Sequence, residues 1–347
     1  MGFWNTILYA FIDAFQYGLP YAMLALGVFI TYRQLDIADL GCEGTFTLGG
    51  AVIGVLVFRD WNPFLAMLIS VLSGFLAGVF TGILHTQLKI PALLSGIITL
   101  TGLFTINMVI MGWGSLSSAN DSLPFFTQMF KKYGASVYLS GSSKSGEKIQ
   151  TIYSLFQSFL KMLGITLQKQ YCVIILNVII VALVVVVLYI FFGTEIGMSI
   201  RSTGMNPLMS RAQGINTSLM IILGLGISNA IIALGGSMFS QVNLSASNTM
   251  GVGTIVVGLA SIIIGEAIFG KRSFKNWLIS VVLGAIIYYL IIAFALALQL
   301  PNHYLKLLYA ILIIIVLIIP SIKTGITKVF KKKEENNVTS NWCFENF

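Results

Sequence analysis

Three carboxylates stand within eight residues of one another, next to the first long apolar run. They are Asp36, Asp39 and Glu43, and Thr45 together with several glycines follows them. Acids beside a membrane span are costly and face a cavity or a partner, unless they lie in a solvated turn or at a helix N-terminus. Three roles stay open: a solvated turn, capping at a helix break, or binding of a substrate ammonium group. We favour capping over ammonium binding, and we group these residues as candidates for a gate.

Three further polar residues lie within or at the end of apolar runs. The side chains of Asn107 and Asn229 are expected to bond across helices or to line a path for solute. Glu266 precedes Lys271 and Arg272. That spacing predicts a surface ion pair with these bases, and a role in the path is the alternative.

The residues that usually carry catalysis are sparse. His85 and His303 fall at the ends of predicted spans without a Cys, Asp or Glu at metal-ligand spacing. The sequence contains no nucleotide-binding loop and no nucleophile motif. We therefore predict no catalytic residues, no metal and no cofactor on this chain, and an integral membrane enzyme is the least favoured class.

The amino-acid composition explains why so few residues could act in catalysis. Of 347 residues, 57% are hydrophobic and 9% are charged, whereas an average soluble domain carries about 25% charged residues. These values exclude an ordinary soluble enzyme, a disordered protein and a nucleic-acid binder. The formal charge of +8 comes from bases in loops and in the C-terminal tail.

The apolar runs predict an all-α polytopic membrane protein, because a bilayer core takes roughly 20 apolar residues as a helix. About nine transmembrane helices are expected, and the second is short enough to be half of a broken helix. Their predicted ranges are 5–32, 43–58, 63–85, 91–113, 171–193, 215–238, 252–269, 275–298 and 304–322.

Basic residues set the expected orientation. Twelve Lys and Arg residues fall on one side of the membrane if the loop 194–214 is cytoplasmic, against Arg59 and Lys306 in short loops on the other side. The N-terminus is then outside and the C-terminus cytoplasmic. The expected domains are a transmembrane domain over 1–325 and a polar cytoplasmic tail over 326–347.

Residues 114–170 are predicted to form an extracellular insertion. Within it, residues 150–163 place apolar side chains at helical spacing. We expect an amphipathic helix on the membrane surface, and a docking surface for an extracellular partner is the alternative.

The loop 194–214 carries signals for a short helix. Asn206 is a good N-cap, Pro207 suits the first helical position, and Gly214 suits the C-terminal end. A helix over 207–213 on the cytoplasmic side fits docking to a cytoplasmic subunit, and a loop without a partner is the alternative. The candidate coupling residues are Arg201, Gly204, Met205, Asn206, Pro207, Arg211 and Gly214.

Two short motifs share one pattern. The sequence Gly-Thr-x-x-x-Gly-x-Ala occurs at 44–51 and again at 253–260. In the expected topology the two runs cross the membrane in opposite directions. This arrangement favours an inverted repeat, in which broken helices meet near the midplane beside the substrate path.

These motifs resemble bacterial ABC importer permeases of the group that includes the branched-chain amino acid and ribose permeases. The likeness rests on 35–49, on 200–207 and on 251–266, and it spans roughly residues 10–325. Within the group, the sequence is most similar to permeases for tryptophan and tyrosine. The insertion 114–170 is longer than the resemblance predicts.

The resemblance implies a multi-pass protein of the bacterial plasma membrane that works in a complex. Two copies would pair as a homodimer surrounded by membrane lipid. Each copy would dock on an ATPase subunit that holds ATP and Mg, and an extracellular substrate-binding lipoprotein would deliver the solute. The expected function is import of a small solute, with an aromatic amino acid as first candidate. The alternatives are branched-chain amino acids, nucleosides or sugars as substrates, an exporter permease, and a secondary transporter driven by an ion gradient.

Overall fold

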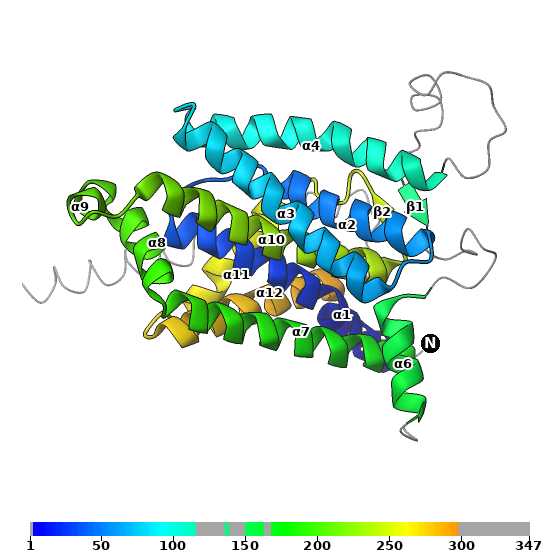
Figure 1. Cartoon of the computed structure of the whole chain (residues 1–347). Coiled ribbons are helices and arrows are strands. Elements are labelled where there is room, and N and C mark those ends of the chain that lie inside the picture. Colours follow the sequence, from blue (N-terminus) through cyan, green and yellow to red (C-terminus); the bar gives the residue numbers. More distant parts are fainter. Residues whose placement is uncertain (1–2, 116–135, 139–149, 163–167, 298–347) are drawn as a thin grey trace, which may run out of the picture. The chain divides into compact units, whose positions relative to one another are not determined.

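The computed structural model describes residues 3–115, 136–138, 150–162 and 168–297, and this part of the chain is almost entirely helical (Figure 1). The elements, in chain order, are α1 Phe3–Phe29, a π-helical turn η1 Ile30–Gln34, α2 Cys42–Phe58, α3 Pro63–Thr86, α4 Ala92–Ser115, β1 Ser136–Tyr138, α6 Ile152–Met162, α7 Lys169–Phe192, α8 Glu195–Met205, α9 Pro207–Ala212, α10 Thr217–Asn243, β2 Ser245–Ser247, α11 Thr254–Phe269 and α12 Phe274–Ala297.

Six of these helices are long and apolar enough to cross a membrane. They match six of the predicted spans. The predicted spans 43–58 and 252–269 correspond to α2 and α11, which are shorter apolar helices. The predicted ninth span at 304–322 and the tail over 326–347 lie outside the described residues.

One small sheet departs from the all-α prediction. β1 pairs antiparallel with β2, so that Val137 lies opposite Ala246. The two strands come from the insertion 114–170 and from the connection between α10 and α11. A pairing between segments more than 100 positions apart carries no local sequence signal.

Helix α10 lies inside the bundle, where it packs against α3, α2 and α1. Glycines let the backbones approach closely, as is typical of helix packing in membranes. Gly74 and Gly78 of α3 face the backbone of α10 at Asn229 and Leu225. Gly236 of α10 faces the carbonyl of Phe46 in α2, where a Cβ atom has no room.

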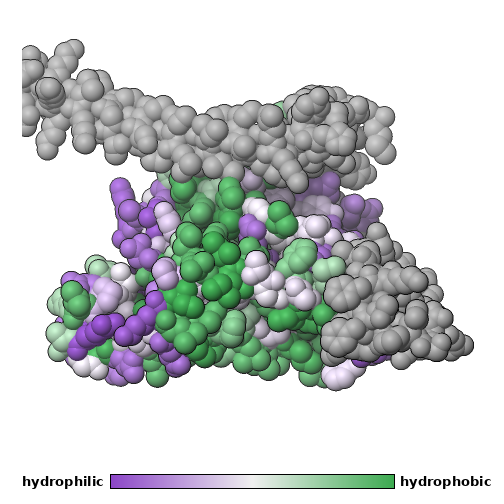
Figure 2. All heavy atoms as spheres, turned by 90° about the horizontal axis from the view of Figure 1, so that it is seen from above, coloured by the Kyte–Doolittle hydropathy of each residue, from purple (hydrophilic) through white to green (hydrophobic). Residues whose placement is uncertain are grey.

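The outer helices present apolar side chains to their surroundings. Large exposed apolar residues follow one face of α3 and one face of α7, among them Leu68, Leu72, Leu76, Leu183, Val186 and Val187. Figure 2 shows apolar surface across the middle of one side of the molecule, with hydrophilic residues gathered toward the end that carries α8 and α9. This distribution is that of a protein embedded in a bilayer.

The predicted amphipathic helix is present as α6, but its first turn is buried in protein. The Tyr153 hydroxyl donates to Asn177 Oδ1 at 2.6 Å, and the Ile152 amide donates to Gln241 Oε1 at 3.0 Å. Phe159 and Met162 at the other end are exposed. The helix is therefore anchored to α7 and α10 at its start, which a purely surface-bound helix would not be.

Candidate functional site

The chain breaks its helix between α1 and α2. The last turn of α1 widens into the π-helical η1, where the Leu35 amide donates to the Ile30 carbonyl at 3.1 Å. Asp36 then adopts a φ of 55°, a left-handed conformation that Asp tolerates better than most residues. π-helical turns within α-helices occur frequently at functional sites. Residues 35–41 form the irregular connection that leads to α2.

Asp39 fixes the start of α2. Its Oδ1 accepts a hydrogen bond from the Gly41 amide at 2.8 Å, and its Oδ2 accepts one from Asn229 Nδ2 at 2.8 Å. The side chain of Asp39 is 4% exposed. Asn229 lies near the middle of α10 (Thr217–Asn243), so α2 begins about halfway along its neighbour. The carboxylate therefore fixes the turn that leads into α2 by bonding the amide of its N-cap residue, Gly41, and ties that turn to α10.

Glu43 links α2 to the start of α11. Its Oε1 accepts a hydrogen bond from the Gly253 amide at 3.0 Å. Gly253 is the N-cap of α11, has a φ of 83° and supplies no side-chain cap of its own. Gly251 packs on the Glu43 carbonyl. The N-termini of the two short helices are therefore neighbours, and the carboxylate of one occupies the N-terminus of the other.

The two motifs of the predicted repeat lie at these helix starts, but in different registers. Gly44 is the third residue of α2, whereas Gly253 precedes the first residue of α11. From their meeting point α2 runs toward the α6 end of the bundle and α11 toward the opposite end, near α9. The structure thus places the two motifs at neighbouring helix starts, and the inverted repeat stays a prediction.

The other gate candidates divide into two groups. Asn107 Nδ2 donates to the Gly44 carbonyl at 3.1 Å, and Thr45 Oγ1 donates to the Gly41 carbonyl at 3.1 Å. Both are buried and close to the start of α2. Asp36 is exposed and is not part of this group. Asn107 and Asn229 thus make the cross-segment bonds that were one of their two expected roles.

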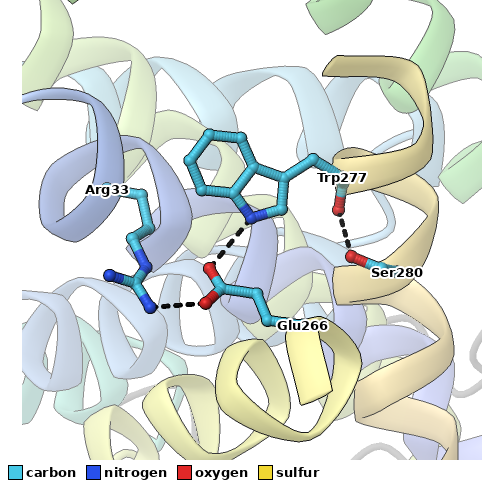
Figure 3. Close-up of polar contacts among 4 residues, drawn as sticks. All are labelled: Arg33, Glu266, Trp277 and Ser280. Atoms are coloured by element: carbon cyan, nitrogen blue, oxygen red, sulfur yellow. Dashed lines mark hydrogen bonds and ion pairs between the residues drawn. The ribbon is translucent and has the colours of Figure 1, made fainter. Parts of the chain in front are cut away.

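Glu266 has a different partner from the one the sequence suggested. Its Oε2 pairs with Arg33 Nη2 in η1, and its Oε1 accepts from Trp277 Nε1 at 2.9 Å. Figure 3 shows the carboxylate held between the two side chains. The predicted pairing with Lys271 and Arg272 is wrong, because α11 ends at Phe269 and its last turn faces α1 and α12.

The segment 194–214, here called the coupling loop, folds as two short helices. Asn206 caps α9, accepting from the amides of Leu208 and Met209 at 3.1 Å, and Pro207 occupies the first position. α9 ends at Ala212, one residue before the predicted end, and Gly214 has a φ of 84°. The preceding helix α8 starts at Glu195 behind a Thr194 cap, a signal that sequence reasoning missed.

Three contacts join the coupling loop to the bundle. The Arg201 guanidinium lies 4.9 Å from the ring centre of Phe274 in α12. Arg211 Nε donates to Thr217 Oγ1 at 2.8 Å. Gly204 packs on the Gln34 carbonyl with no room for a Cβ atom. Arg201, Gly204 and Arg211 are predicted coupling residues, whereas no sequence pattern indicates that Gln34 contacts one of them.

Apolar side chains of the coupling loop are exposed in the part of the chain that the structure describes. Met205 is 88% exposed, Leu208 is 76% exposed and Met209 is 59% exposed. They surround the capped start of α9, which Figure 1 places at one extremity of the bundle. Contiguous exposed apolar side chains on an ordered element mark an interaction surface.

Among the residues that the structure describes, no three His, Cys, Asp or Glu side chains form a group that could hold a metal ion. His85 Nδ1 lies 2.8 Å from the Ile90 carbonyl, in the turn between α3 and α4. His303 and Cys343 lie outside the described residues.

Comparison with known proteins agrees with this architecture. The family model described as branched-chain amino acid transport system / permease component matches residues 11–317. A tyrosine transport system permease protein of Clostridioides difficile is 33% identical over 92% of this chain and 95% of its own length. The nucleoside ABC transporter permease protein NupC of Lactococcus lactis is 24% identical over 76% of this chain and 77% of its own. The guanosine ABC transporter permease protein NupQ of Bacillus subtilis is 23% identical over 72% and 73%.

The match covers most of the chain and includes the helix break, the coupling loop and the start of α11. The chain is a multi-pass membrane protein and a transport component rather than a catalytic enzyme, and its family implies ATPase and substrate-binding partners. It belongs to the permease family of branched-chain amino acid transport systems.

Proposed function

We propose that this chain forms the translocation path of an ATP-binding cassette importer for a small solute, with tyrosine or a related aromatic amino acid as first candidate. It works as a homodimer in the bacterial plasma membrane. Each copy docks on an ATPase subunit that holds ATP and Mg, and an extracellular binding lipoprotein delivers the solute. The chain itself supplies the path and the surface that receives the ATPase.

The observation that carries this proposal is the exposed apolar surface of the coupling loop. Met205, Leu208 and Met209 lie on two ordered helices and find no cover within the described chain. Asn206 fixes the start of α9 with two backbone bonds. An apolar surface held in one conformation binds a partner with little loss of entropy on ordering. A secondary transporter, driven by an ion gradient, has no need of such a surface.

The proposed substrate follows from how similar the chain is to relatives named for different substrates. The relative named for tyrosine transport is 33% identical over most of both chains, whereas the two named for nucleosides are 24% and 23% identical over about three quarters. We therefore rank an aromatic amino acid first. Nucleosides are the second candidate, and they share with tyrosine a flat ring and several hydrogen-bonding groups.

The helix break supplies the moving part in this proposal. Alternating access needs an element with two arrangements that the partner's nucleotide state can bias. α2 and α11 begin beside each other, and Asp39 and Glu43 hold those starts through a few hydrogen bonds. In this mechanism Asp39 and Glu43 are capping residues at the gate, and the solute passes beside them.

Uptake in cells tests the proposal. Labelled tyrosine is offered to cells with and without this gene, first alone and then with excess leucine or guanosine. The proposal predicts that deletion lowers tyrosine uptake and that leucine does not compete. Competition by guanosine together with loss of guanosine uptake transfers the assignment to nucleosides, and uptake that survives depletion of ATP contradicts the importer.

A further inference from the structure

We propose that residues 33–35, here called the hinge segment, transmit movement of the coupling loop to both short helices, and that the Arg33–Glu266 ion pair is what joins α11 to it. The inference rests on the proposed function, because it assigns the residues through which an ATPase would act on the gate. Three sets of contacts connect the hinge segment to α8, to α2 and to α11.

The first set joins the coupling loop to the hinge segment. Gly204, near the end of α8, packs on the carbonyl of Gln34 so tightly that a Cβ atom has no room. The side chain of Leu35 lies against Gly224 of α10, beside Ile200 of α8. Ile200 and Leu35 are both buried. In close-packed surroundings a displacement of α8 must move the backbone at 34–35.

The second set joins the hinge segment to α2. The Leu35 amide bonds to the Ile30 carbonyl, and the Ile37 amide bonds to the Thr31 carbonyl at 3.0 Å, so the chain leaves η1 in a fixed direction. Seven residues later α2 begins, with Asp39 holding that start against Asn229. Movement at 34–35 therefore reaches α2 through the chain itself.

The third set joins the hinge segment to α11, which is far away in sequence. Arg33 pairs with Glu266 in the last turns of α11, and Glu266 also accepts from Trp277 of α12 (Figure 3). The Trp277 ring packs edge-on against Phe29 of α1, with 4.8 Å between ring centres. The Glu266 side chain is 12% exposed and that of Arg33 is 31% exposed. Partial burial shields the pair from water and makes it stronger than a fully exposed one.

The ion pair is the polar attachment of α11 to the hinge segment. Elsewhere α11 packs on its neighbours, with Gly265 against the Ser280 carbonyl of α12, Gly258 against Leu24 and Val28 of α1, and Ile262 buried in the core. These contacts join α11 to α12 and to the body of α1, whereas the ion pair joins it to the hinge segment itself. Without the pair, movement of the hinge segment would reach α11 only indirectly, through its contacts with α1, α2 and α12.

The first test compares solute moved with ATP hydrolysed. The chain is purified with its ATPase and binding protein and reconstituted in vesicles with labelled tyrosine. Glu266→Gln keeps an acceptor for Trp277 and removes the charge, and Asp13→Asn on the exposed face of α1, outside the coupling loop and the hinge segment, is the matched control. We expect tyrosine moved per ATP to fall about 2- to 30-fold in Glu266→Gln, the usual range for residues on a coupling route, and to stay unchanged in Asp13→Asn. An unchanged ratio in an assembled Glu266→Gln complex overturns the inference.

The second test needs no transported substrate. Cysteines replace Ile268 at the exposed end of α11 and Leu72 on the exposed face of α3, in a chain whose native cysteines are replaced, and both carry spin labels. Vanadate trapping of the ATPase should change the distance between the labels in the parent chain and leave it unchanged in Glu266→Gln. A change that persists in Glu266→Gln, or no change in a parent complex that hydrolyses ATP, contradicts the role of the ion pair.

The double reversal Arg33→Glu with Glu266→Arg guards against a variant that merely fails to fold. We expect it to restore part of the coupling lost in either single reversal, and no restoration counts against the inference. The failure of the proposed function looks different, because in that case no ATPase accompanies the chain and neither test shows a dependence on nucleotide in the parent protein.

Discussion

Asp39 Oδ2 accepts a hydrogen bond from Asn229 Nδ2 at 2.8 Å, across 190 positions of sequence. The bond places the start of α2 beside the middle of α10, and with it the helix break inside the bundle. Because Asp39 Oδ1 also accepts from the amide of Gly41, the N-cap residue of α2, one carboxylate both fixes the turn before α2 and tethers it to α10. The proposed gate depends on both of these hydrogen bonds.

Replacing the Asp39 carboxylate should destabilise the protein. The Asn side chain has one acceptor oxygen, whereas two N–H groups donate to Asp39. Asp39→Asn therefore leaves a buried donor without a partner, which lowers the free energy of unfolding by about 1–3 kcal/mol. Thermal unfolding in detergent measures the loss. Asp36→Asn is the matched control, because Asp36 is exposed and Asn tolerates its left-handed backbone. Equal melting temperatures for the two variants would refute the double role of Asp39.

A methyl group at the crossing of α2 and α10 should also be costly. Gly236→Ala places a Cβ atom on the Phe46 carbonyl, and overpacking of this kind costs about 1–3 kcal/mol. Gly102→Ala on α4 is the comparison, since nothing lies within 4 Å of its added atom. We expect a lower melting temperature and a lower yield of folded protein for Gly236→Ala alone. A Gly236→Ala protein as stable as Gly102→Ala would show that the crossing is looser than described.

Glu43 should act on α11 through an acceptor oxygen more than through its charge. Glu43→Gln keeps an acceptor oxygen for the Gly253 amide. Glu43→Ala leaves the N-terminus of α11 without this acceptor, which lowers stability by about 1 kcal/mol. Hydrogen exchange at the start of α11 measures the effect. We expect faster exchange in Glu43→Ala and nearly parental exchange in Glu43→Gln. If both variants exchange alike, the cap assignment fails.

The coupling loop should bind its partner through apolar contacts. Leu208→Ser removes a 76%-exposed apolar side chain that touches little of its own chain, so folding should stay unchanged while the bound ATPase decreases several-fold. Phe159→Ser on α6 makes a similar change at the opposite end of the bundle, where we expect no effect on the ATPase. Quantification of the co-purified subunit checks both. Equal losses in the two variants would indicate a general defect of the membrane protein.

Local signals predicted much of the architecture. The apolar runs predicted the long helices, and Asn206-Pro207 predicted the start of α9, because caps and hydrophobic lengths are encoded within a few residues. The short length of the second span already indicated a broken helix, and the structure starts α2 beside the middle of α10. The family resemblance stated from the motifs is confirmed by the match over residues 11–317.

Contacts between distant segments could not be predicted in the same way. Glu266 lies five positions from a base, so the local pattern favoured Lys271, yet its partner Arg33 is 233 positions away. The pairing of β1 with β2 and the anchoring of Tyr153 to Asn177 likewise arise from how segments meet in space. Gln34 belongs to no sequence motif. It is part of the site only because Gly204 packs against its carbonyl in the folded chain. Such tertiary contacts override local patterns.

The most direct test of the central claim is purification of the tagged chain from its native membrane, followed by identification of what accompanies it and measurement of ATP hydrolysis. The account predicts that an ATP-binding cassette subunit co-purifies in equal amount with the chain. It also predicts that the subunit is lost when Asn206 and Pro207 are both replaced by Ala. A chain that purifies alone, yet moves solute in vesicles under an ion gradient without ATP, would contradict the account.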